Sequence, residues 1–131
     1  MQKTEKNIIG KFVHLFKDEY FWYENTKNEK AGIFYTDNVE EVTGYTKEEL
    51  NTLPGKGKDI IYSEDLQELK KQVNEFKNDP TNNFLEIQFR IMRKDKKKVW
   101  VKEVICVNRN KEGEILESFG KVYNISSYKE K

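Results

Sequence analysis

The segment LEIQFRIM, residues 85–92, alternates apolar with polar side chains and sets the pattern for the C-terminal half. Such a period of two is typical of a strand with one buried face. Two more strands are expected over 99–107 and 115–125, the last one interrupted by Gly120. Because residues 104–107 are all apolar, both faces of the middle strand are expected to meet other parts of the protein.

A long helix is predicted just before these strands. Ser63 is a candidate N-cap residue, with two acidic residues in the first turn of the helix. Pro80 and the polar residues before it end the helix. Its apolar stripe has spacings of three, four and three and consists of Leu66, Leu69, Val73 and Phe76.

Two short helices precede the long one. Asn38 is a candidate cap for the first, which Gly44 ends. Thr46 and Glu49 have the spacing of a capping box for the second. Further upstream, strands over 20–26 and 33–37 are expected to form a hairpin.

Residues 5–18 predict an amphipathic helix at the N-terminus. Two opening strands and three closing strands around several helices predict an α+β fold, with one five-stranded antiparallel sheet and the middle helices on one face. The N-terminal helix either covers the other face of its own sheet or pairs with a second copy in a homodimer. Its apolar stripe, the expected dimer interface, is Ile9, Phe12, Val13 and Phe16.

Composition excludes several kinds of partner. The chain has 131 residues and a net charge of +1, which suits one domain and disfavours nucleic acid or direct membrane contact. Cys106 is the only cysteine, so no internal disulfide or cysteine-based zinc site is expected. The N-terminus is too polar for a secretion signal or an anchor, which favours a cytoplasmic domain whose parent chain could still be membrane-attached.

The order of these elements resembles that of the PAS domains, in particular the subgroup that ends in a basic strand, a tryptophan strand and an Asp-Ile-Thr exit. The resemblance runs from about Tyr20 to Ser126, with Asn124 where the exit motif has Asp. The matching elements are Ile33-Phe34-Tyr35, Val39-Glu40-Glu41-Val42-Thr43-Gly44-Tyr45, Lys47-Glu48-Glu49-Leu50, Tyr62-Ser63-Glu64-Asp65, Phe89-Arg90-Ile91, Arg93-Lys94-Asp95, Val99-Trp100-Val101, Gly113, Gly120 and Asn124-Ile125-Ser126.

The resemblance implies a sensor or interaction module of a signalling protein such as a histidine kinase or a diguanylate cyclase. Ligand occupancy or dimer rearrangement would be relayed to an attached output domain through a terminal helix. Residues 1–19 would then form a cap or dimerisation helix, 20–126 the PAS domain, and 127–131 a tail leading to the output domain. The expected signal exit is Asn124, Ile125 and Ser126.

The main candidate site is the space between the sheet and the middle helices. If it is open, its apolar walls would suit a small ligand. The alternative is a protein-interaction domain in which Phe and Tyr side chains fill the core. The expected wall residues are Phe34, Val42, Leu50, Ile61, Leu66, Leu69, Val73, Ile87, Phe89, Val101, Ile105 and Phe119.

Neither haem nor covalently bound flavin is expected as a cofactor. Light-sensing relatives carry their reactive cysteine on a helix, whereas Cys106 falls in a strand and is interpreted as an ordinary buried thiol. Haem-binding relatives carry a histidine on the long helix, where this chain has none. His14, the only histidine, is interpreted as a surface or interface residue.

No catalytic or metal-binding residue is predicted. Asp37, Glu40 and Glu41 could serve a small α+β isomerase or hydrolase, but no partner base accompanies them and capping roles explain them better. The lysines at 96–98 are interpreted as a solvated turn, because a nucleic-acid patch would favour Arg and exposed aromatic residues. The segment 55–58 lacks the spacing of a phosphate-binding loop.

Overall fold

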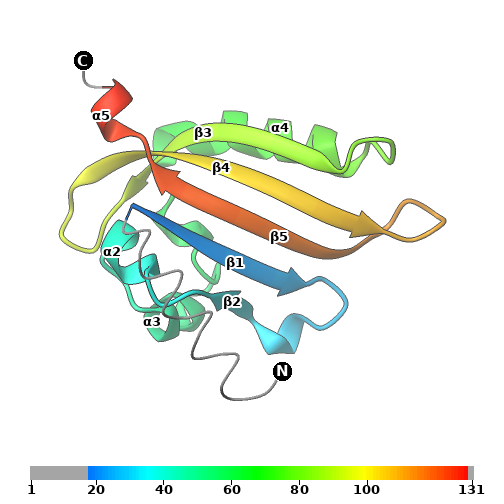
Figure 1. The fold of residues 1–131 in the computed structure, drawn as a ribbon, viewed down its shortest axis with the longest axis horizontal. Helices are drawn as coiled ribbons and strands as arrows, with labels where there is room; N and C mark the ends of the chain where they lie inside the picture. The colour runs from blue at the N-terminus through cyan, green and yellow to red at the C-terminus, as the bar shows by residue number, and fades with distance from the viewer. Residues whose placement is uncertain (1–17, 130–131) are drawn as a thin grey trace.

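The computed structural model describes residues 18–129. The described chain forms one antiparallel five-stranded sheet with strand order β2-β1-β5-β4-β3 (Figure 1), which confirms the predicted α+β fold. The strands are β1 (Glu19–Asn25), β2 (Ile33–Tyr35), β3 (Phe84–Met92), β4 (Lys98–Arg109) and β5 (Ile115–Asn124). The helices are η1 (Glu29–Ala31), α2 (Val39–Thr43), α3 (Lys47–Thr52), η2 (Lys58–Ile60), η3 (Ser63–Asp65), α4 (Leu66–Lys77) and α5 (Ser126–Lys129). The predicted N-terminal helix and its apolar stripe lie outside the described residues.

The first and last strands are neighbours at the centre of the sheet. Trp22 of β1 pairs with Gly120 of β5, and Ile105 of β4 pairs with the same glycine from the other side. This connection joins the N-terminal hairpin to the three C-terminal strands. The strands adopt this arrangement because their apolar faces become buried together only within one continuous sheet.

The helices cover one face of the sheet, called here the inner face. Figure 1 shows α4 behind β3 and β4, and α2 and α3 beside β1 and β2. Inner-face residues are largely buried, as Ile87, Val101 and Val122 show with exposed fractions of 3%, 0% and 2%. The opposite face, called here the outer face, carries several exposed aromatic residues.

The short helix α2 is held by side chains rather than by its expected cap. Asn38 does not cap the helix with its side chain; instead its amide donates to the carbonyl of Glu19, and its Oδ1 accepts from Thr36. This prediction was wrong because the buried amide satisfies the end of β1 instead. Gly44 ends the helix as predicted, with a φ of 81°.

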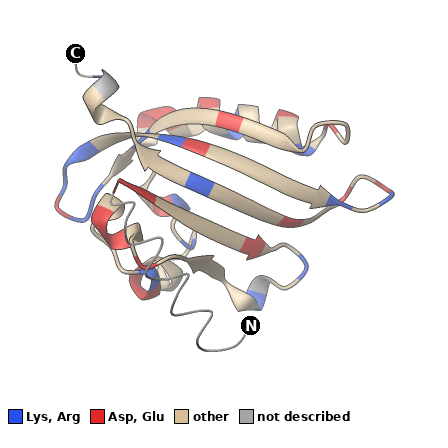
Figure 2. Cartoon of the chain, in the orientation of Figure 1, with Lys and Arg blue, Asp and Glu red and all other residues tan. Residues whose placement is uncertain are grey.

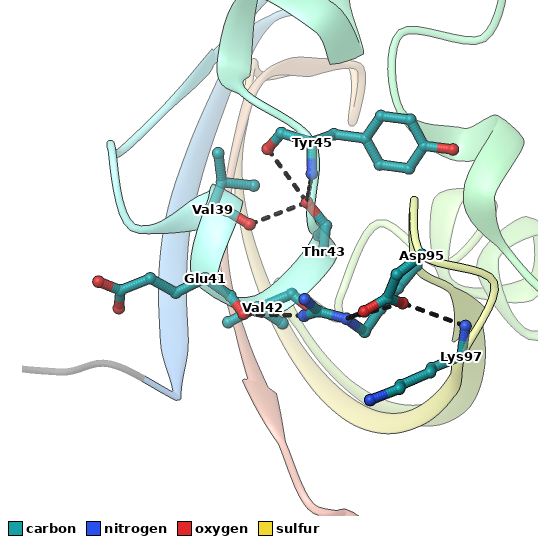
Figure 3. Close-up of polar contacts among 8 residues, drawn as sticks. Val39, Glu41, Val42, Thr43, Tyr45, Asp95 and Lys97 are labelled. Carbon is teal, nitrogen blue, oxygen red and sulfur yellow. Dashed lines mark hydrogen bonds and ion pairs between the residues drawn. The ribbon is translucent and has the colours of Figure 1, made fainter.

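A cluster of polar contacts attaches the end of α2 to the β3–β4 turn (Figure 3). The buried hydroxyl of Thr43 donates to the carbonyl of Val39 at 2.8 Å. Arg93 donates to the carbonyls of Glu41 and Val42 at 2.8 and 2.6 Å, and thereby satisfies helix-end acceptors. The charged residues on the two sides of this contact have opposite sign: Figure 2 shows acidic residues on α2 and α3 and basic residues in the β3–β4 turn.

The other two helix starts differ in how well their caps were predicted. The capping box is confirmed: Glu49 N donates to Thr46 Oγ1 at 3.1 Å, and Thr46 N donates to Glu49 Oε1 at 2.9 Å. Ser63, by contrast, does not cap the long helix. It begins the 3₁₀ turn η3, and α4 starts only at Leu66. The carboxylate just before α4, Asp65, binds Arg90 of β3 instead of the helix.

Candidate functional site

A cavity of about 760 Å³ lies between the inner face of the sheet and the α4 and η2 segments. Its size falls within the range of roughly 300–1,000 Å³ that small-molecule sites occupy. Aliphatic side chains and Phe89 form most of its walls. The apolar lining comes from Ile33, Ile60, Ile61, Leu66, Leu69, Val73, Phe76, Ile87, Phe89, Ile91, Ile105, Val107 and Ile115.

Two carboxylates, Glu24 of β1 and Glu103 of β4, interrupt this apolar lining. Glu103 lies on β4 between the inner-face residues Val101 and Ile105, and it lines the cavity. The indole Nε1 of Trp22 donates to Glu103 Oε2 at 2.8 Å. Trp22 reaches Glu103 from β1 by crossing β5 at Gly120, which has no side chain to obstruct it.

Burial raises the pKa of Glu103 from its ordinary value of 4.5 to about 7. The cause is loss of hydration, because protein encloses much of the carboxylate, which lines the cavity. The hydrogen bond from Trp22 and the positive charge of Lys58 both favour the ionised form and offset part of this effect. The cavity therefore contains a group that changes charge near neutral pH.

Two tyrosines accompany this carboxylate. Burial raises the pKa of Tyr20 well above its usual value, and the charge of Glu103 adds to the shift. The pKa of Tyr35 is raised for the same two reasons, and its hydroxyl donates to the carbonyl of Lys56 at 2.7 Å. The two ring centroids lie 6.0 Å apart, and both tyrosines line the same cavity as Glu103.

Lysines surround the cavity where it meets solvent. Lys58 of η2 and Lys70, Lys71 and Lys77 of α4 contribute to its lining, and all four are exposed. Their ammonium groups keep access to water. The cavity thus combines a positively charged rim with an interior that is apolar except for a few polar groups.

The structure brings together most of the predicted wall residues. Ile61, Leu66, Leu69, Val73, Ile87, Phe89 and Ile105 all line the cavity. Val42, Leu50 and Val101 are fully buried in the adjoining core, with exposed fractions of 2%, 1% and 0%, and do not reach it.

Phe34 and Phe119 lie on the outer face instead. Their exposed fractions are 61% and 42%, because neighbouring residues of β2 and β5 take the inward positions. They line a hollow of about 340 Å³ that also includes Phe21, Val104 and Cys106. The interpretation of Cys106 as a buried thiol was therefore wrong: it lies in a strand as predicted, but it is exposed on the outer face.

The predicted signal exit forms a compact junction with β4. Ile125 N donates to the carbonyl of Trp100 at 2.9 Å, and Trp100 N donates to Ser126 Oγ at 3.1 Å. Asn124 Oδ1 accepts from Ser126 N at 2.8 Å, so the amide stabilises the turn from β5 into α5. Arg90 lies 5.2 Å from the Trp100 ring and also binds Asp65 at the start of α4. Side-chain contacts therefore connect one end of α4 with the exit.

The carboxylates considered for catalysis do not reach the cavity. Asp37, Glu40 and Glu41 are exposed, and Asp37 pairs with Lys47 at 2.6 Å. In the part of the chain that the structure describes, no cluster of three His, Cys, Asp or Glu side chains could hold a metal ion. None of the helices within this part is long and apolar enough to span a membrane.

Sequence reasoning missed the polar residues of the cavity, Glu103 among them. A signal for Glu103 was available, because it is the one charged residue in the inward series Val101, Glu103, Ile105 and Val107 of β4. No local pattern indicated its partner Trp22, which is 81 residues away in the chain.

Comparisons with known proteins agree with this architecture. A family model described as the PAS fold matches residues 32–120. No curated protein matches the chain. Among solved structures, a sensory box histidine kinase/response regulator from Burkholderia thailandensis E264 superposes with a TM-score of 0.71 and 14% identity, over 92% of this chain and 86% of that chain.

Two further solved structures illustrate the range of similar proteins. The N-terminal domain of a diguanylate cyclase with a PAS/PAC sensor, from Marinobacter aquaeolei, has a TM-score of 0.69 and 18% identity, covering 85% of this chain and 98% of that chain. A light-oxygen-voltage domain studied with a flavin analogue has a TM-score of 0.60 and 14% identity, covering 91% and 85%. At these identities the likeness shows a shared fold.

Proposed function

Because the matched residues make this chain a member of the PAS domain family, we propose that it is a sensor module that binds a small ligand and regulates an attached output domain. The observation that carries the proposal is the cavity of about 760 Å³ with Glu103 inside it. A filled core, the alternative considered from the sequence, would leave no such volume. The output domain we propose is a histidine kinase or a diguanylate cyclase, the classes in which similar folds occur.

Native mass spectrometry of freshly purified protein tests ligand binding. We expect a retained small molecule in the wild type and its loss in Ile105→Phe, which fills the cavity from β4. The matched control is Val104→Phe, since Val104 is the neighbouring residue but lines the outer hollow. An empty wild-type protein, or equal retention in both variants, would contradict the proposal.

The domain is proposed to act as a homodimer. Support comes from the outer face, where Phe21, Phe34 and Phe119 leave apolar surface exposed. The stripe Ile9, Phe12, Val13 and Phe16 is proposed to contribute to the interface. Deleting residues 1–18 should convert a dimer into a monomer in sedimentation velocity, and an unchanged dimer would remove this assignment.

Signal output is proposed to leave through Asn124, Ile125 and Ser126. The hydrogen bonds of this turn with Trp100 support the assignment, because a shift of β4 relative to β5 would disturb them. In a full-length protein, Ser126→Ala should change the ligand response of the output domain while leaving ligand affinity in the cavity unchanged. An unaltered response would argue against this exit.

We propose no catalytic activity for the domain itself, and a cytoplasmic location for it. The carboxylates that an isomerase or hydrolase would have used lie at the surface, away from the cavity. Covalent flavin attachment through Cys106 is not proposed either, because this residue lines the outer hollow rather than the cavity. Haem is likewise not proposed, since no histidine lines the cavity within residues 18–129.

A further inference from the structure

We infer that the cavity selects an amphiphilic amine, whose apolar body packs between α4 and the sheet and whose protonated nitrogen donates to Glu103. This inference rests on the proposed function, because it names the chemical class of the ligand for the same cavity. It follows from the hydrogen bonds of Glu103, from the aromatic residues that line the cavity, and from the difference in hydration between Glu103 and the lysines at the rim.

Glu103 has acceptor capacity that the described protein does not use. A carboxylate accepts about four hydrogen bonds, whereas in residues 18–129 only Trp22 Nε1 donates to it, through Oε2. No lysine or arginine of this part of the chain lies at ion-pair distance from the carboxylate, although Lys58 contributes at longer range. A bound group that donates hydrogen bonds would therefore complete this site.

Trp22 defines what the ligand must supply. An indole nitrogen donates and cannot accept, so Trp22 holds the carboxylate in place but offers a ligand no acceptor. The remaining oxygen, Glu103 Oε1, is a site for a donor. An enclosed carboxylate left unpaired is costly, and a cation that pairs with it recovers part of the lost hydration energy.

The aromatic rings that line the same cavity also favour a positive charge. Tyr20, Trp22, Tyr35 and Phe89 all line the cavity. The faces of such rings attract ammonium groups, and the attraction is stronger where water is excluded. A neutral head group would gain less from the ring faces than a cation, and an anionic one would be repelled by them.

The lysines at the rim are less decisive for the head group. They are exposed, so water and salt screen their attraction for an anion. Glu103 is enclosed by protein. A charge in such surroundings interacts more strongly than an exposed charge does over the same distance. The rim lysines Lys58, Lys70, Lys71 and Lys77 can instead cover the apolar end of a bound ligand with their methylene chains.

Three indole compounds of similar shape test this inference by isothermal titration calorimetry at pH 8: tryptamine, the alcohol tryptophol, and indole-3-propionate. We expect tryptamine to bind the wild type most tightly. Glu103→Gln should weaken tryptamine at least about tenfold, the loss typical of one charge-assisted hydrogen bond, and leave tryptophol almost unchanged. Glu86→Gln is the matched control, because Glu86 is an exposed carboxylate on the outer face of β3.

A second measurement needs no variant and so does not depend on how Glu103→Gln folds. Tryptamine binding near pH 6.5, followed in buffers of different ionisation enthalpy, should release a proton as Glu103 ionises, whereas tryptophol should release none. The other titratable groups that line the cavity are the carboxylate Glu24, the lysines Lys58, Lys70, Lys71 and Lys77, and the tyrosines Tyr20 and Tyr35. The tyrosines titrate far above this pH.

The outcomes separate this inference from the proposed function. Equal or tighter binding of tryptophol or indole-3-propionate would overturn the amine assignment while supporting a ligand-binding cavity. Tryptamine binding that survives in Glu103→Gln, or that releases no proton, would also overturn it. If none of the three compounds binds, the amine assignment is overturned, and native mass spectrometry decides the proposed function independently.

Discussion

The indole of Trp22 occupies the space that a side chain at Gly120 would need. A Cβ at Gly120 would lie 2.0 Å from Trp22 Nε1 and 2.1 Å from its Cε2. Because these residues pair across β1 and β5, the missing side chain lets the indole cross β5 and donate to Glu103 on β4. The orientation of the cavity carboxylate therefore depends on a glycine that does not contact the carboxylate itself.

Gly120→Ala should displace the Trp22 ring and break its hydrogen bond to Glu103. We expect a loss of about 2 kcal/mol in unfolding free energy, within the range for overpacked interiors. In a Trp100→Phe background, where Trp22 is the only tryptophan, its fluorescence should also shift to longer wavelength.

The control for this change is Ser118→Ala, two residues earlier on the same strand and face, which should cost less than about 1 kcal/mol. If the Gly120→Ala variant kept the stability and fluorescence of the wild type, the residues around Trp22 would be able to rearrange and accommodate a methyl group.

Glu103→Gln should stabilise the protein above neutral pH and have little effect in acid. The folded protein holds the Glu103 proton up to a pKa of about 7, whereas the unfolded chain loses it near 4.5. Folding therefore becomes less favourable as the pH rises between these two values, and the variant escapes this cost.

Urea denaturation at pH 5 and pH 8 measures this effect. The stability difference between Glu103→Gln and wild type should increase by about 2 kcal/mol between the two conditions. Glu86→Gln, at an exposed carboxylate paired with Lys102, should show no such change. A pH-independent difference would mean that Glu103 is hydrated in the folded protein.

Arg109 should be a main determinant of how α4 is attached to the sheet. Its guanidinium donates to the carbonyls of Phe76, Lys77, Asn82 and Gly113 at 2.8, 3.1, 3.2 and 2.8 Å. These contacts join the end of α4 to the β4–β5 turn. A planar group with five donors is needed for this geometry, so lysine is not an adequate replacement.

Both Arg109→Ala and Arg109→Lys should lower the unfolding free energy by roughly 2–3 kcal/mol, since several acceptors lose a charged donor. Amide exchange at the C-terminal turn of α4 should accelerate in parallel. Lys111→Ala, at an exposed position in the β4–β5 turn, serves as the control. Full stability of Arg109→Lys would show that charge alone is sufficient.

Asp65 and Arg90 should stabilise the protein at neutral pH and lose this contribution in acid. Side-chain hydrogen bonds from Arg90 are the largest influence on the pKa of Asp65 and lower it; the 2.8 Å bond from the Arg90 backbone N–H acts in the same direction. Since the folded protein favours the ionised carboxylate, the stabilisation exists above the unfolded pKa and disappears as the pH falls through the lowered value.

Asp65→Asn should therefore cost roughly 1 kcal/mol at pH 7, after allowance for solvent screening, and much less at pH 2.5. The matched control is Glu64→Gln, because Glu64 faces the same arginine at 3.6 Å but its side chain is 69% exposed. An equal loss in both variants would mean that the geometry of the Asp65 pair has no special effect.

Local signals were sufficient for the order of elements. The alternation in residues 85–92, the capping box at Thr46 and the glycine after α2 act over a few residues, so they can be identified before any tertiary contact is known. The signals that misled were also local. Ser63 and Asn38 are both good cap residues, yet contacts from elsewhere in the protein decided where the helix began or what the amide bound.

The amino-acid order alone thus established a five-stranded α+β fold and most of the aliphatic cavity wall, because these depend on periods of two and 3.6 residues along the chain. Only the folded arrangement decided that Phe34, Phe119 and Cys106 belong to the outer face and that Trp22 meets Glu103. In short or uniformly apolar strands, the alternation of side chains along the chain does not identify the buried face. The buried face is determined by pairing with strands that are distant in sequence, and this pairing also determines which polar groups meet inside the cavity.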